Sequence, residues 1–163
     1  MHGNTKNMAL GGILAALGVV FMCMGTLIPL ATFVCPMLCM VTLSIVRRLA
    51  GKRMGWAWYI CVGLLSGLLA PDKEAAAVFV FIGYYPLIKP ILDRSKLSLI
   101  WKLLFFNAAI LLMYTVLIHL LGMDAIAAEF AEMGRIITVL TLALGNICMV
   151  LLDMVLARVE KMK

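Results

Sequence analysis

The residues in this chain that could do chemistry are few and widely separated. The two histidines, His2 and His119, stand far apart in the sequence. The sequence contains no His-Glu-x-x-His zinc motif, no Gly-x-Ser-x-Gly nucleophile turn and no glycine-rich phosphate loop. We therefore expect a protein that is not an enzyme, and that binds no metal and no other cofactor.

The densest group of charges is Asp72-Lys73-Glu74, which precedes an uncharged run ending at Ile88. Asp72 is a favourable N-cap residue, and Glu74 would lie in the first helical turn, where the helix dipole favours negative charge. Capping alone could explain this cluster. The alternative is that Lys73 faces a binding pocket.

The far end of the same run carries aromatic, proline and lysine residues. Tyr84 and Tyr85 are predicted to lie near a membrane interface, which favours aromatic rings with a polar tip. Pro86 and Pro90 each remove a backbone donor and should bend or break a helix. Lys89 is expected to extend its ammonium group into the cytoplasm.

A few polar residues interrupt the other apolar runs. They are Thr26, Asn107, Tyr114, His119 and Asn146. Because polar groups in lipid are costly, they should face the interior of a helix bundle. There they could contact a substrate, or they could simply bond to neighbouring helices. An ion channel or exchanger would need a charge in mid-membrane, and only Asp153, near the inner end of the last apolar run, comes near that position. The alternative is that Asp153 lies at the interface and pairs with a neighbouring basic residue.

Composition explains why these polar residues are so sparse. Of the 163 residues, 65% are hydrophobic and 13% are charged, and the mean hydropathy is +1.11. Soluble domains contain about 45–50% apolar and about 25% charged residues. A core of this size could not bury so much apolar surface. The chain is therefore predicted to be an all-α integral membrane protein in which residues 1–163 form a single transmembrane domain, and its net charge of +6 does not indicate a nucleic-acid binder.

Hydropathy and charge together predict six spans with both termini in the cytoplasm. The expected helices are Met8–Leu27, Thr32–Val46, Met54–Leu69, Lys73–Leu92, Leu97–Leu121 and Gly134–Ala157. A short amphipathic helix over 124–135 should lie on the outer face. Of the 14 Lys and Arg residues, all but Lys73 and Arg135 then fall on one side, which identifies that side as cytoplasmic.

The first predicted span carries two pairs of small residues. Gly11 and Ala15 form one pair, and Gly12 and Ala16 form the other on an adjacent face. Small residues at this spacing let helices approach closely in lipid. The pairs could serve internal packing, or they could dock another membrane protein.

With six short spans and these small-residue pairs, the sequence resembles the substrate-binding S components of energy-coupling factor (ECF) transporters, which are bacterial importers of vitamins and other micronutrients. The resemblance implies a carrier in the plasma membrane that captures a small polar molecule from outside. It implies two kinds of partner, a transmembrane coupling subunit and ATPase subunits, besides the lipid bilayer. The implied docking residues are Gly11, Gly12, Ala15 and Ala16. The candidate substrate-binding residues are Thr26, Lys73, Tyr114, His119, Arg135 and Asn146.

A second family has a similar size and number of spans. MreD-type proteins are membrane scaffolds of the cell-shape and cell-wall machinery. A scaffold would need a partner surface but no substrate pocket. The acidic outer segment 124–135, the two outer cations Lys73 and Arg135, and Tyr114 favour the carrier interpretation.

Overall fold

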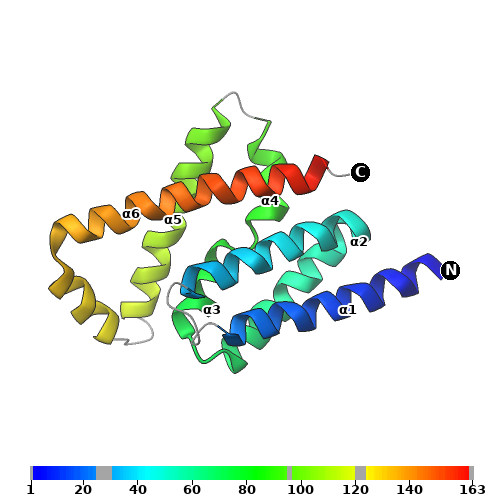
Figure 1. Ribbon diagram of the computed structural model, residues 1–163, viewed down its shortest axis with the longest axis horizontal. Coiled ribbons are helices and arrows are strands. Elements are labelled where there is room, and N and C mark those ends of the chain that lie inside the picture. The colour runs from blue at the N-terminus through cyan, green and yellow to red at the C-terminus, as the bar shows by residue number, and fades with distance from the viewer. Residues whose placement is uncertain (1, 25–30, 95–96, 120–123, 162–163) are drawn as a thin grey trace.

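A computed structural model gives the arrangement of the helices (Figure 1). It describes the backbone of residues 2–24, 31–94, 97–119 and 124–161, and the side chains of residues 8–24, 33–94, 97–119, 139 and 142–161. The helices are α1 His2–Cys23, α2 Ala31–Leu69, α3 Lys73–Ile82, α4 Tyr85–Leu92, α5 Ser98–His119 and α6 Asp124–Lys161. The predicted all-α class is therefore confirmed.

Four segments of the described chain are long and apolar enough to cross a membrane. They are Phe33–Leu69, Lys73–Leu92, Ser98–His119 and Leu142–Lys161, and Met8–Cys23 is a shorter apolar helix. Many large apolar side chains on these helices are exposed. A chain that leaves so much apolar surface outside its own core is suited to lipid rather than water. The fold is that of a multi-pass helical membrane protein.

Helix α2 is a hairpin of two helical halves. Its sharp bend lies at Gly51, whose φ of 89° and ψ of 171° belong to a region that only glycine adopts readily. The sequence predicted two helices separated by a loop over 47–53. The structure replaces that loop with a single non-helical residue, because Leu, Ala, Lys and Arg around Gly51 are good helix formers and extend both halves to the bend.

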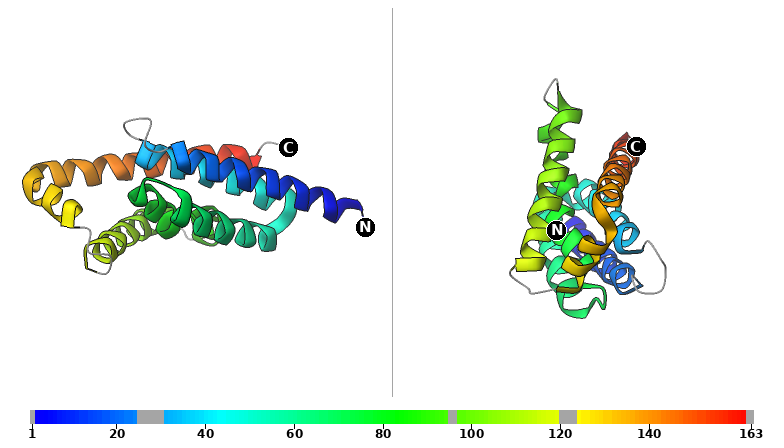
Figure 2. Two further views of the ribbon diagram at one scale, coloured as in Figure 1. Left: turned by 90° about the horizontal axis from the view of Figure 1, so that it is seen from below. Right: turned by 90° about the vertical axis from the view of Figure 1, so that its left-hand side faces the viewer.

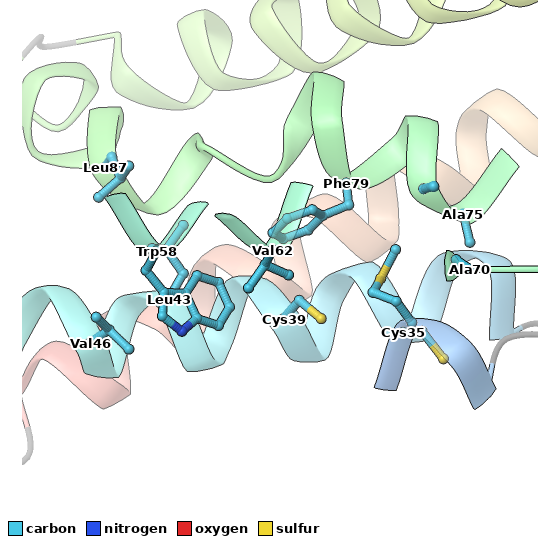
Figure 3. Close-up of a cluster of buried hydrophobic side chains, with 12 residues drawn as sticks. Cys35, Cys39, Leu43, Val46, Trp58, Val62, Ala70, Ala75, Phe79 and Leu87 are labelled. Atoms are coloured by element: carbon cyan, nitrogen blue, oxygen red, sulfur yellow. The ribbon is translucent and has the colours of Figure 1, made fainter. Parts of the chain in front are cut away.

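The two halves of α2 pack against each other and against α1 and α3. Their apolar side chains form one buried cluster, seen in Figure 3. It contains Cys35, Cys39, Leu43 and Val46 from the first half, Trp58 and Val62 from the second, Phe79 from α3 and Leu87 from α4. The five cysteines are all free thiols. Cys35 and Cys39 act here as small apolar packing residues.

The predicted span Lys73–Leu92 is split into α3 and α4 by a turn at Gly83 and Tyr84. Pro86 has no N–H to donate to the carbonyl of Ile82, and its ring would crowd that carbonyl, so the helix cannot continue through this point. The predicted break at Pro86 is confirmed. Pro90, by contrast, is accommodated inside α4.

Helices α5 and α6 complete the fold around a second buried cluster. Tyr85, Phe106, Met113, Met149 and Leu156 are among its members. The segment 124–135 and the last span form one continuous helix, α6, which changes direction between its yellow and orange parts (Figure 1). In Figures 1 and 2, α5 is steeply inclined to α1 and to the second part of α6, so the described helices do not lie in one near-parallel bundle.

Candidate functional site

The start of α3 organises one end of the molecule. Asp72 caps the helix, because its Oδ1 accepts a hydrogen bond of 3.0 Å from the N–H of Ala75. Lys73 donates a 3.0 Å hydrogen bond to the carbonyl of Gly67 in the last turn of α2. The capping prediction for Asp72 is thus confirmed, and Lys73 joins two consecutive helices at their shared end.

Glu74 links this end to α5. The hydroxyl of Tyr114 donates a 2.7 Å hydrogen bond to Oε1 of Glu74. Because Lys73 and Glu74 are adjacent, the structure brings Lys73 and Tyr114 to the same end of the fold. His119, also predicted for the substrate site, is exposed at the C-terminus of α5. Thr26 and the side chain of Arg135 lie outside the described residues.

Asn146 lies elsewhere and forms a closed pair with Asn107. Each amide Nδ2 donates to the other side chain's Oδ1, at 3.0 and 3.2 Å. Each Nδ2 also donates, at 2.8 Å, to the carbonyl of the residue four positions earlier in its own helix. These bonds use both donors of both amides. The pair joins α5 to α6, as the bundle-bonding alternative predicted, and it leaves Asn146 no donor for a substrate.

The small residues of α1 divide into a filled face and an open face. A Cβ atom at Gly11 would come within 2.9 Å of the Met54 side chain, and one at Gly18 within 3.0 Å of Trp58. These glycines let α1 pack tightly against the second half of α2. A Cβ atom at Gly12 would meet nothing within 4 Å. Gly12 and Ala16 are both exposed, while Ala15 packs against the buried cluster.

A network of four charged side chains, two buried lysines and two partly exposed acids, lies at the other end of the fold, and its extent was not predicted. Asp153 on α6 accepts hydrogen bonds from the Tyr85 hydroxyl at 2.6 Å, the Lys89 ammonium at 2.6 Å and the Lys102 ammonium at 2.9 Å. Asp93 also pairs with Lys89, at 3.2 Å, and with Lys102. The network therefore connects α4, α5 and α6 and contains equal numbers of acids and bases.

One expectation about this network is wrong. Lys89 does not extend into solvent, since it is 2% exposed and bonded to Asp153. Tyr85 is fully buried beneath the same carboxylate, and its place relative to a membrane interface stays a prediction. The predicted pairing of Asp153 is confirmed. The i,i+4 spacing of Lys89 and Asp93 was the sequence signal that could have revealed a paired, rather than solvated, lysine.

The described side chains contain no cluster of histidine, cysteine and acidic residues that could hold a metal ion. The network acids are each engaged by ammonium groups, and the Asn pair is saturated. The chemistry these groups support is therefore ionic and hydrogen-bonded cross-linking of helices. The positions left for recognition are the Lys73–Glu74–Tyr114 end, the open face of α1, and the surface of the basic end.

The fold and these sites together define a multi-pass helical membrane protein. No protein-family model matches the chain, and neither a curated protein nor a solved structure matches it.

Proposed function

We propose that this protein is the membrane-embedded S component of an ECF-type importer. It would cross the bacterial plasma membrane six times with both termini in the cytoplasm, and it would capture a small polar molecule from outside. A coupling subunit and ATPases would then drive uptake. The resemblance in the sequence motivates this proposal, and the geometry of the helices supports it as follows.

The six-span topology is supported by the hairpin in α2. A straight helix of 39 residues would be about 58 Å long, roughly twice the hydrocarbon thickness of a bilayer. The bend at Gly51 divides it into two lengths that each suit one crossing. In Figure 1 the bend lies on the same side of the molecule as the N and C termini. That is the arrangement expected for an even number of spans with both termini inside.

The single observation that carries the proposed function is the open face of α1. One small-residue face of this helix is filled by Met54 and Trp58, while the Gly12–Ala16 face has no neighbour in the described part of the chain. In lipid, a face of small residues favours close approach of another helix. An S component needs such a face for its coupling subunit.

The proposed substrate site lies at the end of the fold opposite the basic residues. Lys73, Glu74 and Tyr114 supply a cation, a carboxylate and a hydroxyl within one cluster that joins α3 to α5. These groups suit a small polar ligand. On binding, the ligand would form hydrogen bonds with them in place of the bonds that now link the helices. Thr26, His119 and Arg135 remain proposed members of this site. Asn146 is not proposed again, because its donors are used.

The docking proposal is tested by replacing Gly12 with Leu. Because nothing lies within 4 Å of a Cβ atom at this position, the variant should fold and insert normally. It should fail to co-purify with an ECF coupling subunit produced in the same cells. Gly67→Leu is a matched control, since Gly67 is equally open but lies on α2. Normal association of Gly12→Leu would contradict the proposed docking face.

An MreD-like scaffold is the second candidate. It is favoured by the fact that Tyr114 and Lys73 already bond to groups of this chain, so that neither is held ready for a ligand. A scaffold would show partner binding through α1 but no small-molecule binding. Ligand binding by the purified protein therefore separates the two candidates.

A further inference from the structure

A basic cavity lies at the end of the molecule that contains the α2 bend. Its volume is about 530 Å³. Arg47, Arg48 and Lys52 from the α2 bend line it together with Arg94, which follows α4. These two segments lie some 40 residues apart in sequence. The positive-inside rule requires only that basic residues lie in cytoplasmic loops, so it does not explain why they converge on one cavity.

The cavity has a large excess of positive charge. Arg47 pairs with Glu160, and Arg48 donates to the carbonyl of Val159, so both are anchored to the end of α6. A guanidinium group has five donors, which leaves donors free on Arg47 after this pairing. Within the described chain, neither Lys52 nor Arg94 has an ion-pair partner.

The remaining wall of the cavity is apolar. Leu87 and Ile91 of α4 contribute to it, and Ile91 is 62% exposed. Arg47 and Arg48 are held by the end of α6. The buried network keeps α4 in place, because Lys89, between Leu87 and Ile91, is tied to Asp153. The cavity thus has a fixed apolar wall, two anchored cations and two cations without partners.

We propose that this cavity binds the phosphate group of an anionic phospholipid headgroup. Arginine donors suit phosphate oxygens, and clusters of basic residues next to the cytoplasmic end of membrane helices bind anionic headgroups. The apolar wall lets the start of an acyl chain lie along Pro90 and Ile91, its two exposed residues. Free phosphate shares the headgroup chemistry but gains nothing from that wall.

The test measures lipid binding to the purified protein in detergent by native mass spectrometry. Phosphatidylglycerol should bind in a one-to-one complex, while phosphatidylcholine, whose headgroup is neutral overall, should bind much more weakly. Inorganic phosphate is added as a competitor in a separate arm. Weak competition at millimolar phosphate is expected for a lipid site. Displacement at the same concentration as the lipid would assign the site to free phosphate.

The double variant Lys52→Gln/Arg94→Gln should bind phosphatidylglycerol roughly 30-fold more weakly, because each basic residue near an anionic headgroup contributes a factor on the order of 5 to the affinity. Its melting temperature without lipid should not change, since neither side chain has an ion-pair partner in the described chain. Lys52→Gln alone should weaken binding on the order of fivefold and provides the test if the double variant is unstable.

Arg53→Gln with Arg158→Gln is the matched control. Both side chains are exposed cations of the same end, and neither lines the cavity. The control should bind phosphatidylglycerol within about threefold of the unmodified protein, because neither side chain lines the cavity and charges exposed to solvent are screened by salt. The proposal would be overturned if the cavity double variant and the control double variant lost the same affinity for phosphatidylglycerol. It would also be overturned if the protein bound phosphatidylglycerol and phosphatidylcholine equally well.

Discussion

Replacing Asp153 with Asn should destabilise the protein strongly. The carboxylate lies between Lys89 and Lys102, at 2.6 and 2.9 Å, and accepts a further bond from Tyr85. The two lysines are only 2% and 6% exposed. Without the negative charge of Asp153, they would share Asp93 as their single counter-ion, and one positive charge would remain uncompensated in a largely buried site.

The expected cost follows from that uncompensated charge. Breaking a buried ion pair by removing one partner costs about 3–5 kcal/mol. The Asp153 side chain is 21% exposed, and the Asn carbonyl can still accept one hydrogen bond, so the lower end of that range applies. A loss of about 3 kcal/mol reduces the ratio of folded to unfolded protein by roughly 100-fold.

The assay is reversible unfolding in mixed micelles, followed by the helical circular dichroism signal as the fraction of denaturing detergent rises. Asp93→Asn is the matched control. Asp93→Asn leaves the same charge imbalance, but the Asp93 side chain is 39% exposed, so water reaches that side of the network, and the more buried Asp153 still bonds both lysines. The free energy of unfolding should therefore fall by only about 1 kcal/mol. Adding Lys102→Met to Asp153→Asn should cost no more than Asp153→Asn alone, because the remaining charges balance. Equal losses for the two Asp variants, or strictly additive losses in the double variant, would refute this reasoning.

Three further changes test separate parts of the fold by the same unfolding assay. Gly51→Ala should lower the free energy of unfolding by about 1–3 kcal/mol, because an L side chain disfavours the backbone conformation at the α2 bend. An unchanged unfolding midpoint would mean that the bend does not require this conformation. Gly18→Leu should lower the free energy of unfolding by about 1–3 kcal/mol, because the larger side chain overpacks against Trp58. Gly12→Leu should leave it unchanged. Similar values for the two variants would contradict the assignment of a filled and an open face to α1. Asn107→Leu should lower the free energy of unfolding by about 1–3 kcal/mol, because one N–H and the Oδ1 of Asn146 lose their partner. Replacing both Asn residues should cost less than Asn107→Leu alone, and additive losses would contradict this.

Local features of the sequence predicted the helix ends well. Asp72 was predicted as a cap because N-capping needs only a short polar side chain and the backbone of the following turn, and the structure shows that bond. Pro86 predicted the break between α3 and α4 because a missing N–H acts on the same helix. Gly51 was not identified as the bend, since glycine is compatible with a loop of several residues as well as with a single sharp turn.

Contacts between distant segments were harder to predict. The sequence shows that Lys89 and Lys102 lie near the ends of apolar runs, where solvated lysines are common. Their burial depends on how α4, α5 and α6 meet, which hydropathy does not specify. Likewise, the periodicity of α1 predicted two small-residue faces but not which of them, Gly11 or Gly12, packs against α2.

The most direct test of the proposed carrier function is native mass spectrometry of the protein purified from bacterial membranes without added ligand. A carrier with the proposed site at Lys73 and Tyr114 should retain a small polar molecule, seen as a discrete mass increase. This adduct should diminish in the Tyr114→Phe variant, which lacks the hydroxyl that contacts Glu74. A protein that carries no small-molecule adduct, and that co-purifies only with components of the cell-wall machinery, would contradict the carrier function and favour a scaffold.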